Sequence, residues 1–361
     1  MNITFFIGGL SGGGAERVVC NLANYTSSKK NDVTILTMTD APATYELNNK
    51  IRRVSLILQD ERKNAVVDFI RRYYRLCKFL KTNKSDVYIV MLPITIILLL
   101  HLNWLTKAKI IVSERSNPKF NKPIEKFFIK HLASRADGWV FQTEENFGWY
   151  KRYINKSKIA IIPNAVGENF VSNVGGVVKR DKNIVTAGRL ADPKNHQLLI
   201  RAFARIQSKF PDYKVMLYGD GPDKENLQFL AKGLGISESV LFPGYCKNIA
   251  EKIENASLFV FTSDWEGMPN ALIEAMGLGV PCISTDFDGG GAKFLINPGN
   301  NGLLVPVGDA DALAKAMERM LSDRDFAEKC GQEARKICER LSPSKIYGEW
   351  ESFIKTVVVC A

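Results

Sequence analysis

The sequence predicts an α/β protein of two domains, each a parallel β-sheet covered by helices. The chain has 361 residues, enough for two domains of ordinary size with separate cores. Short apolar runs rich in β-branched residues alternate with stretches of helical spacing up to about residue 322. Glycines interrupt this alternation over residues 164–182, which we interpret as a linker. An N-terminal domain is therefore expected over residues 1–166 and a C-terminal domain over residues 180–340.

The amino-acid composition limits the classes of protein to which the chain can belong. A hydrophobic content of 46% and a charged content of 24% are typical of a globular chain. The seven cysteines never form a C-x-x-C pair, and there are only three histidines, so we expect neither a disulfide framework nor a metal centre. Residues 1–7 lack the basic start and long apolar core of a signal peptide, which favours a cytoplasmic protein.

One stretch, residues 87–105, is apolar enough to suggest a membrane span. It contains Pro93, Thr95, His101 and Asn103, which are unfavourable in a bilayer core. We interpret it instead as a buried strand over 86–91 and a buried helix over 94–105.

Charge is unevenly distributed along the chain. Residues 1–166 hold 26 Lys and Arg against 13 Asp and Glu, whereas the remaining residues are close to neutral. Such asymmetry predicts an anionic partner that touches the N-terminal half alone: a membrane surface, a lipid diphosphate or a nucleic acid.

The first half begins with a strand over 2–7, a glycine-rich turn and a helix over 15–27. Gly12, Gly13 and Gly14 would let a phosphate or sugar approach backbone N–H groups at the helix start. The spacing is not G-x-G-x-x-G, so a dinucleotide fold, with Asp40 as ribose ligand, stays a weaker alternative. Further strands are expected over residues 32–38, 86–91, 109–112, 138–142 and 159–163.

A helix over residues 62–84 interleaves apolar and basic residues, and two interpretations stay open. Its apolar stripe either packs on the core beneath a solvated basic face, or lies against anionic lipid, where each cation adds about 1 kcal/mol. A second helix repeats the pattern with Lys119, Lys122, Lys126 and Lys130 beside phenylalanines. The stripe consists of Val66, Phe69, Ile70, Tyr73, Leu76, Phe79 and Leu80, and the cations are Arg71, Arg72, Arg75, Lys78 and Lys81.

Polar residues follow two of the expected strands directly. Glu114 and Arg115 follow the strand over 109–112 and are candidates to bind an acceptor or to orient a donor sugar. Arg189 and Lys194 flank the turn after the strand over 183–187, where a guanidinium fork and an ammonium would suit a diphosphate. Further strands are expected over 214–218, 240–242, 258–261 and 281–285, with helices over 197–209, 223–233, 249–255 and 310–322.

The most informative stretch covers residues 264–279. Glu266 lies in a loop, Pro269 suits the first position of a helix, and Glu274 falls among apolar residues inside that helix. A phosphate at the helix start between Met268 and Ala271, with a glutamate on either side to accept hydroxyl hydrogen bonds, suits a sugar nucleotide. The alternative is an exposed Glu266 and a Glu274 that pairs locally.

Two glutamates separated by seven residues, each in its E-G or E-A setting, resemble the E-x7-E signature of family 4 glycosyltransferases. These are retaining enzymes of the GT-B fold, in which two Rossmann-like domains face a cleft. The resemblance implies that a C-terminal helix over 343–361 packs back on the first domain. Lys293 follows a glycine loop at the place where the family usually carries Glu.

The resemblance also implies roles for individual residues. The catalytic set is Glu266, Arg189 and Lys194, and the donor-binding set is Glu274, Gly267, Met268, Asn270, Ala271, Gly219, Gly221 and Tyr245. Gly12, Gly13 and Gly14 would face the cleft, on the acceptor side with Glu114 and Arg115.

The activity implied is transfer of a sugar from a nucleoside diphosphate donor, expected to be a UDP-sugar, without metal or other cofactor. The nearest resemblance is to bacterial enzymes that build polyprenyl diphosphate-linked glycans, which implies an acceptor of that kind, an anionic membrane surface on the cytoplasmic side, and no nucleic acid. Two alternatives remain: a nucleotide-sugar epimerase of the same fold, which would need an acid/base pair, and a non-catalytic membrane-associated glycan-binding protein.

Overall fold

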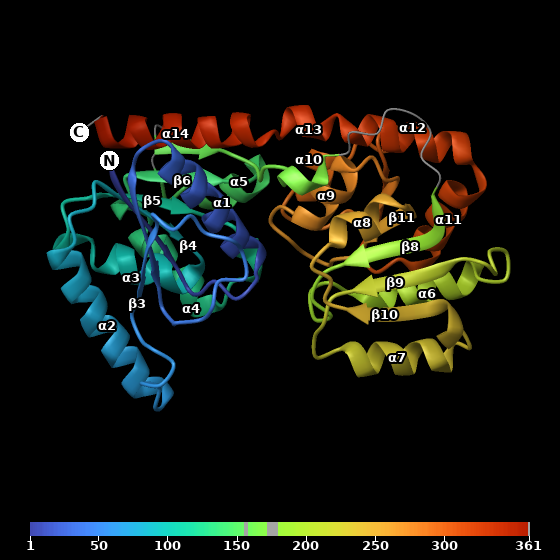
Figure 1. Ribbon diagram of the computed structural model, residues 1–361, viewed down its shortest axis with the longest axis horizontal. Helices are drawn as coiled ribbons and strands as arrows, with labels where there is room; N and C mark the ends of the chain where they lie inside the picture. Colours follow the sequence, from blue (N-terminus) through green and yellow to red (C-terminus); the bar gives the residue numbers. More distant parts are fainter. Residues whose placement is uncertain (155–157, 172–179, 360–361) are drawn as a thin grey trace. The chain divides into compact units, whose positions relative to one another are not determined.

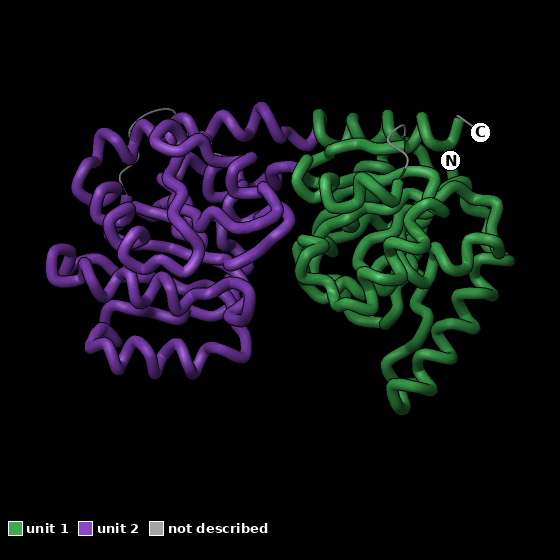
Figure 2. Tube along the Cα trace, turned by 180° about the vertical axis from the view of Figure 1, so that it is seen from behind, with its two compact units in different colours: residues 1–164, 344–361 green, residues 165–343 purple. Residues whose placement is uncertain are grey.

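A computed structural model describes residues 1–154, 158–171 and 180–359, and the chain divides into two compact units (Figure 2). Unit 1 comprises Met1–Asn164 and Ser344–Ala361, and unit 2 comprises Ala165–Pro343. Part of the expected linker, residues 172–179, lies outside the described residues. Its beginning is not a linker, because Val166 and Phe170 are buried against Gly277 of unit 2.

Within the described residues, unit 1 holds a seven-stranded parallel sheet in the order β3-β2-β1-β4-β5-β6-β7. Four of these strands, β3, β4, β5 and β6, are labelled in Figure 1. Its strands are β1 Asn2–Ile7, β2 Asp32–Thr37, β3 Arg52–Ser55, β4 Val87–Met91, β5 Lys109–Ser113, β6 Gly138–Phe141 and β7 Ile159–Ile161. Its helices are α1 Gly14–Ser28, α2 Ala65–Thr82, α3 Pro93–His101, α4 Pro123–Leu132, α5 Glu144–Tyr150 and α14 Pro343–Val359. Short 3₁₀ turns occupy Asn103–Leu105, Pro118–Phe120 and Ala133–Arg135.

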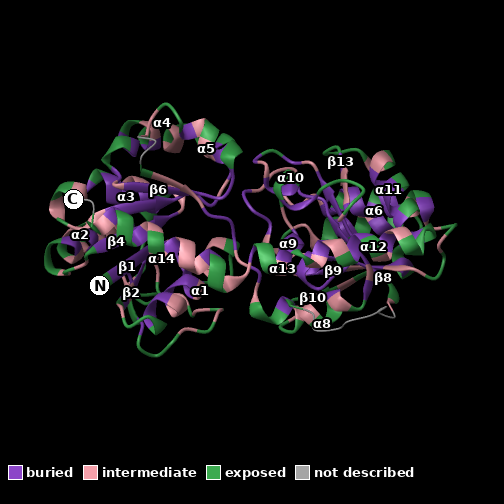
Figure 3. Cartoon of the chain, turned by 90° about the horizontal axis from the view of Figure 1, so that it is seen from above, coloured by how far each residue is buried: buried purple, intermediate pink, exposed green. Residues whose placement is uncertain are grey.

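The centre of this sheet is buried on both faces, as continuous apolar strands predict. Every residue of β4 is buried, and the strands of both units are largely buried in Figure 3. The apolar stretch after residue 86 is therefore a strand followed by a helix, as expected, although α3 ends at His101. None of the helices in the described parts of the chain has the length and apolar character needed to span a bilayer.

Helix α2 does not pack its whole apolar stripe on the core, which was one of the two interpretations of its sequence. Only Leu76 and Leu80 of its apolar stripe are buried, together with Asp68. Val66, Phe69 and Ile70 are 69%, 47% and 60% exposed. The stripe is therefore not a core stripe over its whole length.

The basic side chains of α2 are also divided between two environments. Both terminal nitrogens of Arg75 donate to the carboxylate of Glu61 at 2.6 Å, and these bonds lower the pKa of Glu61 to about 2. Arg71 donates to the main-chain oxygen of Glu61 at 2.8 Å. Lys78 and Lys81 remain exposed. Two of the five cations expected on a free basic face therefore hold the preceding loop.

Helix α14 returns to unit 1 and packs on β6. Trp350 is buried, and a Cβ added to Gly138 of β6 would lie 2.9 Å from Val357 and 3.0 Å from Phe353. Glycine at position 138 is thus required by the close approach of helix and strand. Residues of the last helix complete the hydrophobic packing of the first unit.

Unit 2 contains, in its described residues, a six-stranded parallel sheet in the order β10-β9-β8-β11-β12-β13. Its strands are β8 Asp181–Ala187, β9 Lys214–Tyr218, β10 Val240–Gly244, β11 Ala256–Phe261, β12 Cys282–Thr285 and β13 Leu303–Val305. Its helices are α6 His196–Ile206, α7 Lys224–Gly233, α8 Ile249–Glu254, α9 Asn270–Gly277, α10 Gly291–Leu295, α11 Ala310–Ser322, α12 Arg324–Arg335 and α13 Ile337–Arg340. The 3₁₀ turns are Glu168–Phe170 and Ser237–Ser239.

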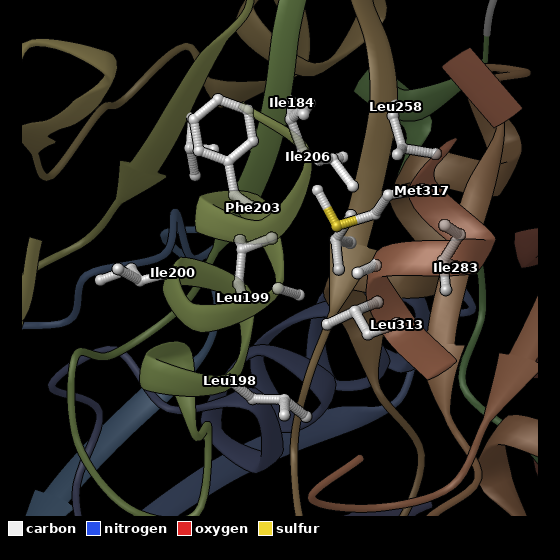
Figure 4. Close-up of a cluster of buried hydrophobic side chains, with 14 of the residues drawn as sticks. Ile184, Leu198, Leu199, Ile200, Phe203, Ile206, Leu258, Ile283, Leu313 and Met317 are labelled. Atoms are coloured by element: carbon white, nitrogen blue, oxygen red, sulfur yellow. The ribbon is translucent and has the colours of Figure 1, made fainter. Parts of the chain in front are cut away.

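One face of this sheet is covered by α6 and α11. Phe203 of α6 and Met317 of α11 point toward Ile184 and Leu258 on the neighbouring strands β8 and β11 (Figure 4). All four side chains are buried. This packing fixes the ends of β8 and β11, which carry the candidate site.

Several elements lack a clear pattern in the sequence. Strands β3 and β13 are short, and helix α12 is too polar to show a strong apolar stripe. The two short strands are stabilised by pairing rather than by local preference, because β3 is hydrogen-bonded to β2 and β13 to β12. In both sheets the strand order reverses once, between β1 and β4 and between β8 and β11. Open parallel sheets place their ligands at the carboxyl ends of strands at such points.

Candidate active site

Two loops of unit 2 meet at the point where its strand order reverses. Residues 188–195 follow β8, and residues 262–269 follow β11, the adjacent strand. The hydroxyl of Thr262 donates to the main-chain oxygen of Lys194 at 2.9 Å, and the N–H of Asp264 donates to that of Pro193 at 2.9 Å. The structure thereby brings the predicted residues Lys194 and Glu266 together, although they are far apart in sequence.

The contact between them is direct. The ammonium of Lys194 lies 2.5 Å from Oε1 of Glu266, and the hydroxyl of Ser263 donates to the same oxygen at 3.1 Å. The ammonium also lies 5.1 Å from the ring centroid of Phe261. Lys194 and Glu266 are 23% and 19% exposed, so the pair is partly shielded from water. The sequence assigned Lys194 to a diphosphate and Glu266 to hydroxyl groups, and it did not predict their pair.

Arg189, the other predicted cation, is exposed at the start of the same loop. Within the described parts of the chain its guanidinium forms no hydrogen bond or ion pair, so its planar fork is available for two oxygens of a phosphate. Its main-chain oxygen accepts a hydrogen bond of 3.2 Å from Nε2 of His196. The loop is thus fixed at its backbone while the charged end of Arg189 stays accessible.

His196 is a residue whose role the sequence did not reveal. It begins α6 and is 5% exposed, and burial lowers its pKa from 6.5 to about 4. The imidazole is therefore neutral near pH 7 and donates from Nε2, which leaves Nδ1 as the unprotonated nitrogen. The position at the start of a helix, directly after the loop that carries Arg189 and Lys194, was the one available signal.

A pH dependence of stability follows from this burial. Between pH 6.5 and about 4 the unfolded chain binds a proton at His196 that the folded protein excludes. The free energy of unfolding should therefore be fully retained above pH 6.5 and fall by up to about 3 kcal/mol toward pH 4. Urea unfolding of the wild type and His196→Gln at pH 6.5, 5.5 and 4.5 measures this. Equal slopes for the two proteins between pH 6.5 and 5.5 would contradict it.

The two glutamates of the signature flank a helix start, as expected. Glu266 precedes α9, and Glu274 lies inside α9 with 5% of its surface exposed. Helix α9 begins at Asn270, and Pro269 is its N-cap residue rather than its first helical residue. The N–H groups of this first turn and the positive end of the helix dipole favour an anion here. Gly267 and Met268 are buried beneath the same turn.

The glycines at the end of β9 are explained by packing. A Cβ on Gly219 would lie 1.9 Å from the main-chain oxygen of Gly188, and one on Gly221 would lie 2.2 Å from that of Leu190. These glycines let the loops after β8 and β9 touch. Tyr245, after β10, is 73% exposed. The donor-binding role assigned to Gly219, Gly221 and Tyr245 stays a prediction.

Two amides of the glycine turn in unit 1 already have an acceptor within the unit. The N–H groups of Gly12 and Gly13 both donate to Oε2 of Glu16, at 2.5 Å and 3.0 Å. A phosphate or sugar that used these two amides would have to displace this carboxylate. Gly14 is the first residue of α1. The turn is exposed, and Gly12 has a φ of +119°, a conformation that side chains rarely adopt.

Glu114 and Arg115 lie in the interior of unit 1. The carboxylate of Glu114 accepts hydrogen bonds from the hydroxyl groups of Tyr150 and Ser116, and its burial raises its pKa. Arg115 donates to Asn164 at 2.8 Å, and its guanidinium lies 5.3 Å from the ring of Trp350. These internal partners give both side chains a role in packing that the sequence did not suggest.

Lys293 replaces the glutamate that is usual in the family, and it pairs with Asp286 at 3.1 Å. The ammonium of Lys293 is largely exposed. Across residues 1–154, 158–171 and 180–359, no three His, Cys, Asp or Glu side chains are grouped so that they could hold a metal ion.

Comparison with known proteins identifies the family of the chain. Residues 12–169 match the family described as Glycosyltransferase Family 4, and residues 168–337 match Glycosyl transferases group 1. The chain is 30% identical over 361 residues, 99% of each protein, to a Campylobacter jejuni enzyme. That enzyme is the α-1,4-N-acetyl-D-galactosaminyltransferase for GalNAc-α-(1→4)-GalNAc-α-(1→3)-diNAcBac-PP-undecaprenol.

The chain belongs to glycosyltransferase family 4. Its two Rossmann-like units form the GT-B fold, shared with sucrose-phosphate synthase from Thermosynechococcus elongatus (TM-score 0.85, 19% identity, all of both chains). Anabaena HepE in complex with UDP is also similar, with a TM-score of 0.82 and 16% identity over 99% of this chain and 100% of that one. As a family 4 glycosyltransferase the protein is an enzyme, and the loops after β8 and β11 are its candidate active site.

Proposed function

We propose that this enzyme transfers an N-acetylhexosamine or hexose from a UDP-sugar to a hydroxyl of a polyprenyl diphosphate-linked glycan, with retention of the α configuration. The observation that carries the proposal is the ion pair of Lys194 and Glu266 at the reversal point of the unit 2 sheet, with the exposed Arg189 on the same loop as Lys194. The UDP-bound relative supports the donor, and the undecaprenol-linked substrate named for the Campylobacter relative supports the acceptor.

The proposed donor step is the departure of UDP from an oxocarbenium-like sugar. The bond between the anomeric carbon and the diphosphate oxygen breaks, and its electron pair leaves with UDP. The acceptor hydroxyl oxygen forms the new bond to that carbon on the same face, and its proton passes to the departing phosphate oxygen. Arg189 and the first turn of α9 stabilise that developing charge, because the guanidinium is accessible and the N–H groups of the helix start are in place before the donor arrives. Lys194 contributes by moving from its pair with Glu266 toward the phosphate, or by bonding both at once.

The glutamates take the sugar side of the donor in this proposal. Once Lys194 bonds to the phosphate, Glu266 accepts hydrogen bonds from hydroxyl groups of the transferred sugar. Glu274, one helical turn beyond the start of α9, accepts those of the ribose. Both carboxylates would then accept hydrogen bonds in a site where an unpaired polar group would be costly.

The test is a donor panel read by mass spectrometry. A short polyprenyl diphosphate carrying a hexosamine or a short glycan is incubated with UDP-, GDP- and TDP-sugars, and the anomeric configuration of the product is read by NMR. We expect transfer from a UDP-sugar and an α-linked product. Transfer only from a GDP- or TDP-sugar would contradict the donor, and a β-linked product would contradict retention.

A second measurement concerns metal ions. Since we assign the leaving diphosphate to Arg189, Lys194 and backbone N–H groups, turnover should persist in EDTA at close to its original rate. The assay compares EDTA-treated enzyme with and without added magnesium or manganese. Loss of turnover that either metal restores would reject this assignment.

We further propose that unit 1 brings the enzyme to the anionic, cytoplasmic face of the membrane that holds its acceptor. The support is a set of large apolar side chains exposed beside lysines on two helices. On α2 these are Val66, Phe69, Ile70 and Tyr74, and on and beside α4 they are Phe120, Ile124, Phe127 and Phe128. We call these eight residues the interfacial surface. Exposed aromatic and aliphatic groups among cations are typical of helices that lie in a bilayer interface.

A further inference from the structure

The two loops of the active site are joined by a side-chain bond next to the reacting groups. Nδ2 of Asn195 donates to Oδ1 of Asp264 at 2.6 Å. Asn195 follows Lys194 directly, and Asp264 precedes Glu266 by two residues. The bond therefore connects the backbone that carries the lysine with the backbone that carries the glutamate.

The backbone at Asn195 is unusual. Its φ is +46° and its ψ +46°, the left-handed conformation, immediately before α6. Among the described residues, the other non-glycine residues with positive φ are Lys30 and Leu92. Asparagine tolerates this conformation better than most residues. Glycine would suit it as well, but it has no amide with which to reach Asp264.

We propose that Asn195 and Asp264 are positioning residues that hold the side chains of Lys194 and Glu266 in the relative positions needed for transfer. The inference rests on the proposed function of those two groups. The side chain of Lys194 has four methylene groups and is flexible. The position of its ammonium therefore depends on how firmly the backbone of Lys194 is held. A displacement of about 1 Å at a reacting group can cost on the order of 100-fold in rate.

Neighbouring contacts show why the bond acts on both loops. The hydroxyl of Thr262 holds the carbonyl of Lys194, and the N–H of Asp264 holds that of Pro193. These bonds fix the loop backbones at two points. The Asn195–Asp264 bond adds a third and, unlike these two, joins two side chains, as the neighbouring Lys194–Glu266 pair also does. Without it, the turn that carries Lys194 can tilt about the remaining two.

The chain allows a matched set of variants. Asn195→Gly keeps the left-handed backbone and removes the bond, whereas Asp264→Ala removes it from the other side. Asp264→Asn keeps an oxygen to accept from Asn195. Asn300→Gly, in an exposed loop of unit 2, is the control for the loss of an asparagine side chain.

The expected kinetic result is a loss in kcat with little change in the KM for the UDP-sugar. Asn195→Gly and Asp264→Ala should each lose about tenfold or more, and the double variant should lose no more than either, because the two residues act as a unit. Asp264→Asn and Asn300→Gly should remain close to wild type. Thermal unfolding of all variants should match within a few degrees.

A second readout does not depend on turnover. Reductive methylation of Lys194, followed by mass spectrometry, reports how firmly Glu266 holds the ammonium. Methylation should be several-fold faster in Asn195→Gly than in wild type and unchanged in Asp264→Asn. Wild-type kcat or wild-type methylation in Asn195→Gly, or additive losses in the double variant, would overturn the proposal.

Lys194→Met and Glu266→Gln separate failure of this inference from failure of the proposed function. If both lose turnover while Asn195→Gly does not, the positioning bond alone is rejected. If both turn over like the wild type, the assigned roles of Lys194 and Glu266 are rejected, and the positioning role falls with them.

Discussion

Arg189→Ala should lower turnover by about 10²–10³-fold while leaving thermal unfolding nearly unchanged, because its guanidinium is exposed and forms no side-chain bond in the described chain. The variant loses the interaction by which Arg189 stabilises the negative charge that develops on the departing diphosphate. The Lys194 ammonium is already paired with Glu266 in the free enzyme, so Arg189 is the cation of this site with an unoccupied fork. Its removal should therefore cost more than its exposed position suggests.

The matched control is Arg201→Ala, which removes an exposed arginine from α6 in the same unit. It changes the net charge equally and should leave kcat within about twofold, since surface substitutions away from a site rarely matter. Arg189→Lys should recover only part of the activity, because an ammonium cannot make a bidentate contact with phosphate. Arg189→Ala activity within a few-fold of wild type would reject the diphosphate role.

Removing the apolar part of the interfacial surface on α2 should weaken binding to anionic vesicles by at least about tenfold. The variant carries Val66→Ser, Phe69→Ser, Ile70→Ser and Tyr74→Ser. A large apolar side chain contributes about 1.5–3 kcal/mol when it is fully buried, so partial insertion of four such groups exceeds the 1.4 kcal/mol that corresponds to tenfold. All four residues are more than 45% exposed, so the fold should tolerate the changes. Cosedimentation with phosphatidylglycerol vesicles measures the binding.

The control replaces four exposed apolar residues of unit 2, Phe229, Leu234, Leu241 and Val307, by serine. It should bind vesicles like the wild type. A charge variant, Lys78→Gln, Lys81→Gln and Lys122→Gln, should lose the preference for anionic over neutral lipid and the steep dependence on salt. It leaves Arg75 unchanged, because that residue holds Glu61. Equal binding by the wild type and the α2 variant would mean that the membrane is reached through another surface.

The two alternative functions, an epimerase and a non-catalytic glycan-binding protein, lose their support. Membership of glycosyltransferase family 4 makes the chain a transferase and removes the reason to expect an epimerase or a non-catalytic glycan-binding protein. The glycine turn of unit 1 is also better understood as a helix start bonded to Glu16 than as the fingerprint of a dinucleotide fold.

Local pattern was enough to predict most of the architecture. Strands β1 and β9 and helix α11 begin and end at the predicted residues, because apolar runs bounded by polar or glycine residues mark buried parallel strands and the helices between them. The sequence also placed Glu266 before a helix and Glu274 inside one. Chemical identity and spacing sufficed there, since both features depend on neighbours within a few residues.

What only the tertiary structure decided are contacts between distant segments. The Lys194–Glu266 pair and the Asn195–Asp264 bond join residues about 70 positions apart, and they exist because β8 and β11 are adjacent in the sheet. Glu114 became a buried residue because α5 brings Tyr150 to it. The exposure of Phe69 depends on which part of α2 the rest of unit 1 covers. Each outcome is set by which elements pack together, and a pattern read along one stretch of chain carries no information on the stretch that will cover it.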